Sequence, residues 1–305
     1  MDRLEAMALL SATVEAGSFS AASRRLGVPL PTLSRKIADL EQHLGIRLLL
    51  RSTRKLGLTE AGADYLASAR RILEQVDEAE RAAAGEWRQP RGELIVTAPV
   101  VFGRLHVLPV VAAFLARYPE IDVQLLLSDR NLGLLADHVD LAVRIGTLPD
   151  SGLVATTVGH LRRVLVAAPA LLDRCGTPQH PEELQSLPCV HYAGLSEARS
   201  WTFSRPDGGL AFTVPIRPRL TVNTVEAGMD AAVAGIGFAQ MLSYQSAGGE
   251  AADALRCVLQ AYEGPLLPIS LLHVGQGRLP LKTRTFLDFA ATRLRSETFI
   301  VAPKP

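Results

Sequence analysis

The stretch SFSAASRRLGVPLPTLSRKIADLEQHLGIRLLLRSTRKLGLTEAG, from Ser18 to Gly62, decides the fold of the N-terminal part of this chain. A short helix is predicted from about Ser20 to Leu26, and Gly27 ends it because glycine tolerates the left-handed backbone of a tight turn. A second helix is predicted from Pro31, and its apolar residues recur at helical spacing: Leu33, Ile37, Leu40 and Leu44. A helix, a glycine turn and a second helix together form a helix-turn-helix.

The front of the second helix is polar and basic. This is typical of a helix that lies in the DNA major groove and reaches base edges with its N-terminal residues. The helix pair is therefore expected to contact double-stranded DNA through Ser20, Thr32, Ser34, Arg35 and Lys36.

A basic loop follows between two short apolar segments, 48–50 and 56–58. A solvated surface turn is the alternative interpretation, but directly after a helix-turn-helix the pattern favours a two-stranded wing whose tip contacts phosphates. The net charge of the chain is only +1, so binding must depend on such local patches of basic residues. The wing residues expected to contact DNA are Arg51, Ser52, Thr53, Arg54 and Lys55.

From about Leu4 to Tyr65 the chain resembles the N-terminal module of LysR-type transcriptional regulators, through SFSAASRRLGV and LSRKIADLEQHLGIRLLLRSTRKLGLTEAG. The resemblance implies a winged helix-turn-helix that binds promoter or operator DNA. This chain has Pro29, Leu30 and Pro31 where the family usually has Ser-Gln-Pro or Ser-Gln-Ser. Proline and leucine can neither cap the helix nor replace the glutamine contact, so base recognition is expected to fall on the residues that follow.

A long helix without proline is predicted from Glu60 to about Glu86, with Thr59 as its N-cap and a length of roughly 40 Å. Its apolar stripe favours pairing with the same helix of a second subunit, and packing on the chain's own C-terminal domain is the alternative. In LysR-type regulators the corresponding helix is the dimerisation linker, which implies a homodimer or homotetramer. The expected dimerisation residues are Tyr65, Leu66, Ala69, Ile72, Leu73 and Val76. The preceding helix is expected to bury Leu4, Met7, Leu10, Val14 and Phe19.

Beyond a hinge at 89–92, short apolar strands alternate with helices, which predicts a mainly parallel sheet with helices on both faces. The first of these helices is expected to bury Leu105, Leu108, Ala112 and Leu115. The domains are predicted at 1–58 (winged helix-turn-helix), 59–89 (linker helix) and 90–305 (two α/β lobes). One lobe takes about 90–162 and 268–305, and the other takes about 163–267. Two crossovers leave a cleft between the lobes, which is the favoured position for a small molecule.

Three segments of this second part resemble the effector domain of the same family: PVVFGRLHVLP, DLAVRIG and AGIGFA. The resemblance implies the fold of periplasmic solute receptors and a small-molecule effector in the cleft. Two converging helix N-termini favour an anion and the neighbouring valines favour an apolar body, so a small aromatic or branched carboxylate is expected. The expected effector-binding residues are Ala98, Pro99, Val100, Val101, Phe102, Arg144, Gly146, Asn223, Thr224 and Gln240.

The sequence contains no complete motif for nucleotide binding or for catalysis by a nucleophile. Gly235-Ile236-Gly237 lacks the third glycine of a dinucleotide loop, and Gly194–Ala198 lacks the closing glycine of a nucleophile elbow. The histidines show no metal-ligand spacing, so no enzyme activity, cofactor or metal is expected. The alternative is a solute-binding receptor or a small-molecule enzyme with an incidental helical N-terminus, but a transport receptor would need an export signal.

The N-terminal sequence and the cysteines indicate the compartment. The chain opens with mixed charge, and no apolar run approaches the ~20 residues of a membrane span, so neither a signal peptide nor a membrane partner is expected. The odd number of cysteines, Cys175, Cys189 and Cys257, predicts buried inert thiols in a reducing cytoplasm, with a redox-sensing pair as the alternative.

Overall fold

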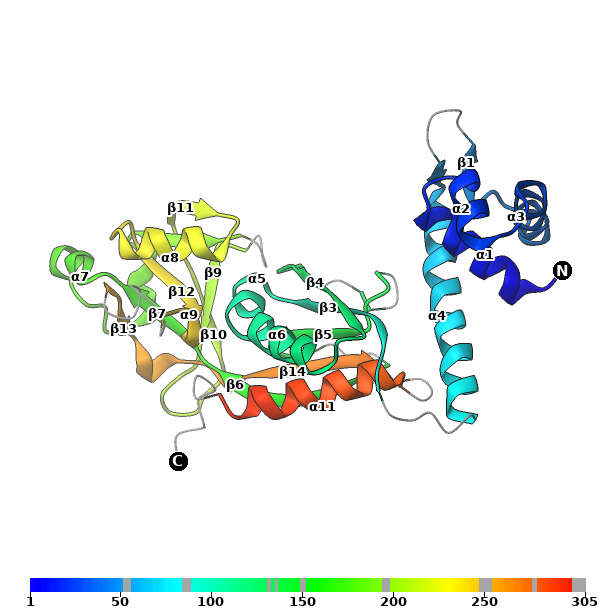
Figure 1. Ribbon diagram of the computed structural model, residues 1–305. Helices are drawn as coiled ribbons and strands as arrows, with labels where there is room; N and C mark the ends of the chain where they lie inside the picture. The colour runs from blue at the N-terminus through cyan, green and yellow to red at the C-terminus, as the bar shows by residue number, and fades with distance from the viewer. Residues whose placement is uncertain are drawn as a thin grey trace. The chain divides into compact units, whose positions relative to one another are not determined.

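The computed structural model describes residues 1–51, 56–83, 89–130, 133–134, 137–148, 152–193, 198–246, 254–275 and 279–297. The chain divides into two compact units, Met1–Gln89 and Pro90–Pro305. Figure 1 shows the helical N-terminal unit and the α/β C-terminal unit. The predicted fold class, a winged helix-turn-helix with a long helix followed by a two-lobed α/β domain, is confirmed.

The N-terminal unit packs three helices and a β-hairpin around one core. Ser18 caps the second helix by accepting a hydrogen bond from the Ala21 amide at 3.1 Å, and Gly27 ends it with φ +67°. The elements are α1 (Arg3–Glu15), α2 (Phe19–Leu26), α3 (Leu30–Leu44), β1 (Leu49–Arg51), β2 (Leu56–Leu58) and α4 (Glu60–Ala83).

Three details of this unit differ from the sequence prediction. Leu4 is 41 % exposed, and Phe19 begins α2 rather than extending α1. The buried face of α1 is centred on Ala6, Leu10 and Thr13, because this helix packs against α2, α3 and α4 at once. Helix α3 begins at Leu30, one residue before the predicted start.

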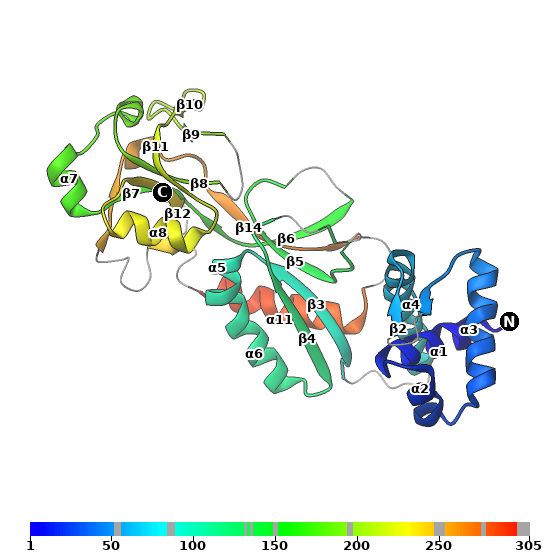
Figure 2. The same cartoon turned by 90° about the horizontal axis from the view of Figure 1, so that it is seen from above.

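Lobe I of the C-terminal unit is a five-stranded sheet in the order β4-β3-β5-β14-β6. Helices α6 and α11 contact each other and pack on this lobe's main core (Figure 2). Its elements are β3 (Gly92–Ala98), α5 (Val100–Phe102), a π-helical turn η1 (Gly103–Val107), α6 (Leu108–Arg117), β4 (Ile121–Leu127), β5 (Leu141–Ile145), β6 (Leu153–Leu161), β14 (Leu267–Val274) and α11 (Leu281–Arg295).

Lobe II is a second five-stranded sheet, in the order β11-β8-β12-β7-β13, and a β9-β10 hairpin packs on it. Its elements are β7 (Arg163–Ala167), α7 (Pro169–Cys175), η2 (Pro181–Gln185), β8 (Cys189–Tyr192), β9 (Ser200–Phe203), β10 (Phe212–Pro215), β11 (Pro218–Val222), α8 (Val225–Val233), β12 (Phe238–Leu242), α9 (Ser243–Ser246), β13 (Arg256–Val258) and η3 (Gln260–Tyr262).

The prediction of a mainly parallel sheet is wrong, because both sheets are mixed. Strand β3 runs parallel to β4 and β5, and β8 runs parallel to β11 and β12. Strand β14 is antiparallel to β5 and β6, and β7 is antiparallel to β12 and β13. The antiparallel strands are those that carry the chain between the lobes: β6 ends at Leu161, β7 begins at Arg163, and β14 is the return.

The helical stretch from Val100 to Arg117 buries a different face from the one predicted. Leu105 and Leu108 are 41 % and 48 % exposed, whereas Val107, Val110, Val111 and Phe114 are buried in the core of lobe I. The stretch is apolar on most sides, so its sequence contains two apolar faces at helical spacing. Packing against the sheet of lobe I determines which face is buried. Among the described residues it is also the one helical stretch long and apolar enough, by length and composition, to cross a membrane.

Candidate DNA-binding surface and effector cavity

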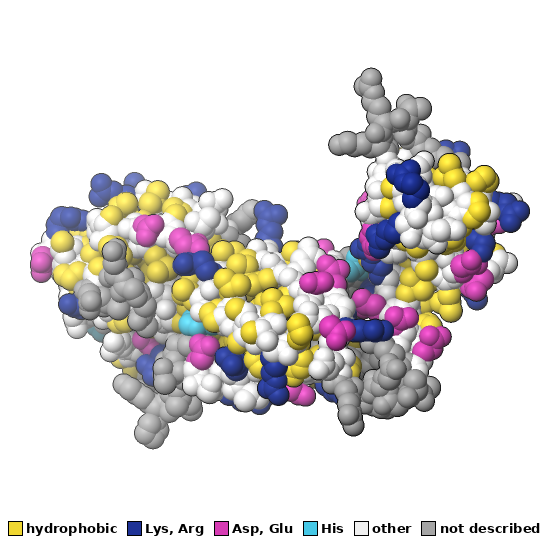
Figure 3. Space-filling view, viewed as in Figure 1, with side chains coloured by type: hydrophobic (Ala, Val, Ile, Leu, Met, Phe, Trp, Pro, Cys, Tyr) yellow, Lys and Arg dark blue, Asp and Glu magenta, His cyan; other side chains and the backbone are white. Residues whose placement is uncertain are grey.

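Helix α3 presents a polar and basic surface opposite its buried side. Leu33, Ile37 and Leu40 are fully buried, which turns the intervening residues outward. Arg35 is exposed and makes neither an ion pair nor a hydrogen bond with the described part of the chain, while Thr32 and Ser34 are half-buried. Pro29 supplies no capping hydrogen bond to α3, as expected for a proline at this position. Figure 3 shows basic side chains on the visible surface of the N-terminal unit.

Two other residues predicted to contact DNA, Ser20 and Lys36, differ from Arg35 in position or in pairing. Ser20 lies exposed in the first turn of α2. Lys36 forms an ion pair with Glu5 of α1, so its ammonium group is directed along the unit's own surface. Exposed ion pairs of this kind contribute little to stability, and a phosphate could compete for the lysine.

The partly buried carboxylate of Glu41 on α3 holds the start of the wing. Glu41 Oε1 accepts hydrogen bonds from the amides of Leu48 at 2.8 Å and Leu49 at 3.0 Å, at the start of β1. Strands β1 and β2 are antiparallel, with Arg51 opposite Leu56. The side chain of Arg51 and the residues Ser52, Thr53, Arg54 and Lys55 lie outside the described residues.

The stripe on α4 that was predicted to form the dimer surface is divided between two environments. Leu66 and Ala69 are 5 % and 0 % exposed, because α4 packs against α1 of the same chain. Arg70 also reaches α1, where it forms an exposed ion pair with Glu15 at 3.2 Å. These two apolar residues are therefore not free for a second subunit, and the prediction is wrong for them. Of the others, Ile72 is 40 % exposed, and three are half-buried: Tyr65, Leu73 and Val76.

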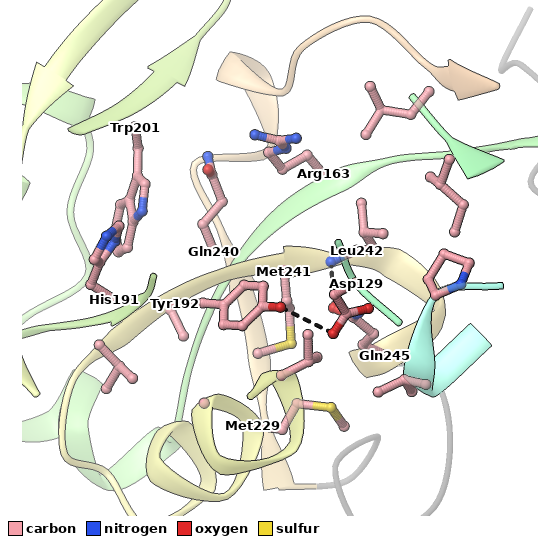
Figure 4. A pocket seen from close by; sticks show the side chains of 18 of the residues that line it. Asp129, Arg163, His191, Tyr192, Trp201, Met229, Gln240, Met241, Leu242 and Gln245 are labelled. Carbon is pink, nitrogen blue, oxygen red and sulfur yellow. Dashed lines mark hydrogen bonds between the residues drawn. The ribbon is translucent and has the colours of Figure 1, made fainter. Parts of the chain in front are cut away.

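A cavity of about 430 Å³ lies between the two lobes, and we call it the inter-lobe cavity (Figure 4). Lobe I contributes the start of α5, the residues after β4, the end of β5 and the start of β14. Lobe II contributes β7, β8, β9, β10, α8, β12 and α9. Its lining residues include Pro99, Val101, Ser128, Asp129, Arg144, Arg163, His191, Tyr192, Trp201, Thr202, Gly228, Met229, Gln240, Met241, Tyr244 and Gln245.

Four of the ten predicted effector residues line this cavity: Pro99, Val101, Arg144 and Gln240. The other six do not line it. Ala98 and Phe102 are buried in the core of lobe I, and Gly146 follows β5 with φ +108°. Thr224 caps α8 by accepting a hydrogen bond from the Ala227 amide at 3.3 Å, so it serves its own helix, and Asn223 precedes it.

Val100 does not line the cavity either, and its amide is already bonded within the chain. The Val100 amide donates to Asp129 Oδ1 at 3.0 Å, and the hydroxyl of Tyr192 donates to Asp129 Oδ2 at 3.0 Å. The chain's own carboxylate thus occupies the helix N-terminus that was predicted to hold an anionic effector. Burial, followed by the charge of Asp129, raises the pKa of the Tyr192 hydroxyl well above its usual value.

The basic residues of the cavity carry its remaining charge. Arg144 is 7 % exposed and donates from Nη1 to the carbonyl of Val143 at 3.0 Å. Arg163 lines the cavity and is exposed. It makes no ion pair or hydrogen bond among the described residues. Desolvation lowers the pKa of both guanidinium groups.

Sequence reasoning missed several cavity residues: Asp129, Arg163, His191, Tyr192 and Trp201. A hydrophobic pattern can predict a strand, but it does not say which end of that strand faces the other lobe. Alternation along β8 and β12 could have placed His191 and Gln240 on one face, given the strand order.

The three cysteines differ in their exposure to solvent. Cys189 is buried, and desolvation raises its pKa to about 12, so it stays a thiol at neutral pH. Cys257 is exposed and Cys175 is half-buried, so the prediction of three buried thiols is wrong for these two. Among the described residues no group of three or more His, Cys, Asp or Glu side chains is placed to hold a metal ion.

A helix-turn-helix unit joined to a two-lobed α/β unit with an inter-lobe cavity defines a class: DNA-binding transcription regulators with a small-molecule domain. Two family models match the chain. Residues 4–63 match "Bacterial regulatory helix-turn-helix protein, lysR family", and residues 88–295 match "LysR substrate binding domain". The chain belongs to the LysR family of transcriptional regulators.

Relatives of known name agree with this assignment. An "HTH-type transcriptional regulator" of Xanthomonas campestris pv. campestris is 38 % identical over 285 residues, covering 92 % of this chain and 82 % of that protein. The structure of CrgA from Neisseria meningitidis, a LysR-type transcriptional regulator, is 30 % identical with a TM-score of 0.59, covering 95 % of this chain and 98 % of that one. The Vibrio cholerae virulence activator AphB has a TM-score of 0.59 at 28 % identity, with coverage of 95 % and 98 %. These proteins are named as transcription regulators or activators, which is the class expected for this chain.

Proposed function

We propose that this protein is a cytoplasmic regulator whose binding to operator DNA is controlled by a small organic molecule in the inter-lobe cavity. The observation that supports this most directly is the composition of the cavity wall. Both lobes contribute to it, and at about 430 Å³ it falls in the range of small-molecule sites. A ligand that touches both lobes can favour one arrangement of them over another, and only such differential affinity can switch a protein.

DNA contact is assigned to the exposed front of α3 and to the wing. Arg35 is the leading candidate for base contact, because it is exposed and has no partner among the described residues. Thr32 and Ser34 lie within one turn of it. Arg51, Arg54 and Lys55 are proposed as phosphate ligands, which would position the unit without reading sequence.

Assembly is assigned to the outer part of α4. Ile72 is exposed there, whereas Leu66 is buried within its own unit. A pair of α4 helices related by two-fold symmetry would cover Ile72, Leu73 and Val76. We propose a homodimer through this surface, which also supplies two α3 helices for two operator half-sites.

Filling the cavity tests effector control. Gly228 on α8 lines the cavity, and a Cβ atom built on it meets only Val222 Cγ2 at 3.6 Å, an ordinary contact. Gly228→Leu should therefore project into the cavity with little backbone strain. The matched control is Val233→Leu, at an exposed position of the same helix.

The measurement is affinity for a selected operator duplex, with and without a panel of small aromatic and branched carboxylates. Wild type and Val233→Leu should change their affinity for DNA with at least one compound. Gly228→Leu should bind the duplex equally well without any compound and lose the response. A Gly228→Leu variant that responds like wild type would place the effector elsewhere.

A further inference from the structure

One face of the lobe II sheet carries three polar side chains on adjacent strands. Strand order places β8 beside β12 and β12 beside β7. Phe238, Cys189 and Leu165 pack in the same core cluster under the β9-β10 hairpin, so they share a face. Side chains alternate along a strand, and therefore Gln240, His191 and Arg163 lie on that face as well, each two residues from one of the three.

The register keeps these side chains close together. Phe238 pairs with Cys189 and Ala239 with Val190, which brings Gln240 alongside His191. On the other side Leu242 pairs with Arg163, which places Arg163 diagonally from Gln240. Figure 4 shows Gln240 between His191 and Arg163 in that view, and all three line the inter-lobe cavity. We call them the polar row.

The polar row has no partners within the described part of the chain, and its members differ in exposure: His191 is buried, Gln240 is half-buried and Arg163 is exposed. His191 is 5 % exposed, and neither ring nitrogen has a hydrogen-bond partner there. The Arg163 guanidinium also lacks one, although an acid is near: Glu263 lines a smaller adjoining cavity but pairs with Arg162 at 3.7 Å. A buried polar group without a partner is costly, which makes the His191 ring a strong determinant of what the site accepts, while the Arg163 guanidinium is an accessible cation at the same cavity.

Apolar surface completes the site. Trp201 is 6 % exposed and lines the cavity beside His191 (Figure 4). Met241 lines the cavity from the other face of β12. Because β8 and β7 stand two strand spacings apart, the backbones that carry His191 and Arg163 are separated by about 10 Å. A planar ring fits between two polar ends at this separation.

We propose that the polar row selects a ring-bearing carboxylate with a second oxygen, a hydroxyl or carbonyl, at its far end. The carboxylate binds Arg163 with help from the Gln240 amide, and the second oxygen hydrogen-bonds His191 beside Trp201. This assignment rests on the proposed effector role of the cavity. It replaces the helix N-termini as the source of anion selectivity, since Asp129 and the Thr224 cap already occupy those.

Three probe compounds separate the two polar contacts: 4-hydroxybenzoate, 4-hydroxybenzamide without the charge, and benzoate without the hydroxyl. Trp201 is one of two tryptophans in the chain, so Trp87→Phe leaves it as the single reporter of binding by fluorescence. In this background 4-hydroxybenzoate should bind at least about tenfold more tightly than either analogue, since each lost polar contact is worth roughly that factor.

Variants assign the contacts to residues. Arg163→Met should abolish the preference for 4-hydroxybenzoate over 4-hydroxybenzamide, and Arg163→Lys should retain part of it. His191→Phe should abolish the preference over benzoate. Arg219→Met, at an exposed position on edge strand β11, is the matched control and should change neither ratio.

An acid preference that survives Arg163→Met would overturn the assignment, and so would a full chain that binds none of the three probes. The operator duplex distinguishes this failure from failure of the proposed function. If 4-hydroxybenzoate binds through the polar row but leaves the affinity for DNA unchanged, the inference holds and effector control through this cavity fails. If DNA affinity responds to another compound while all three probes fail to bind, effector control stands and the inference fails.

Discussion

Asp129 of lobe I accepts a hydrogen bond from the hydroxyl of Tyr192 of lobe II at 3.0 Å, across the inter-lobe cavity. The same carboxylate accepts the amide of Val100 at the start of α5. One acidic side chain therefore satisfies a helix N-terminus of one lobe and a phenol of the other. The relative positions of the lobes are tied to this contact, and a ligand that enters the cavity must adapt to it or break it.

Removing the Tyr192 hydroxyl tests this connection. Tyr192→Phe leaves the ring in place, and we expect it to lower the free energy of unfolding of the C-terminal unit by about 1–2 kcal/mol, because a hydrogen bond to a charged group is lost. Denaturant unfolding measures the change. Tyr118→Phe removes a hydroxyl that has no hydrogen bond among the described residues, and it should be nearly neutral. Equal effects of the two substitutions would mean that the connection between the lobes contributes nothing.

The pH dependence of the same variant has a defined sign. The pKa of Tyr192 is raised in the folded protein, by desolvation first and by Asp129 second. Below the unfolded value of about 10 the phenol is protonated in both states, so its contribution is complete there and declines as pH rises above that value. The difference in Tm between wild type and Tyr192→Phe should be constant from about pH 6 to 9 and shrink above pH 10. A difference that already falls between pH 7 and 9 would show that another group controls the contact.

The surface of α4 predicts a charge-sensitive dimer. Ile72→Glu would place two carboxylates near the two-fold axis, and we expect it to shift the dimer to far higher protein concentration in sedimentation experiments. Gln75→Glu introduces the same charge at an exposed polar position of α4 and should leave the dimer intact. If both variants remain dimeric at wild-type concentrations, this helix is not the dimer interface.

The wing predicts a change in salt dependence rather than in sequence preference. Arg54→Ala should weaken binding to all duplexes about equally and reduce the slope of log K against log salt by about one unit, because each neutralised phosphate releases about one counterion. Titrations of one duplex at several salt concentrations measure this slope. A slope that matches wild type would remove Arg54 from the set of phosphate ligands.

The sequence was sufficient for the fold class and insufficient for the strand directions and the cavity, because the fold class depends on local signals and the other two depend on long-range pairing. Gly27 and the spacing of Leu33, Ile37 and Leu40 are local signals, and the structure places these residues as predicted. The cavity depends on which strand ends face each other, and this follows from long-range pairing such as that of β12 with β7 and β8. Val100 illustrates the difference: its position at a helix start was predictable, but its hydrogen bond to a residue 29 positions later was not.

Selection of bound sequences from a random duplex pool tests sequence-specific DNA binding through α3 most directly. The selection is run with wild type and with Arg35→Ala, each at two salt concentrations. We expect wild type to enrich two related half-sites at a fixed spacing, and Arg35→Ala to enrich the same motif with one base pair per half-site relaxed, at a cost of about 1–3 kcal/mol. A wild-type pool without an enriched motif would contradict sequence-specific binding, and identical motifs from both proteins would show that Arg35 does not read a base.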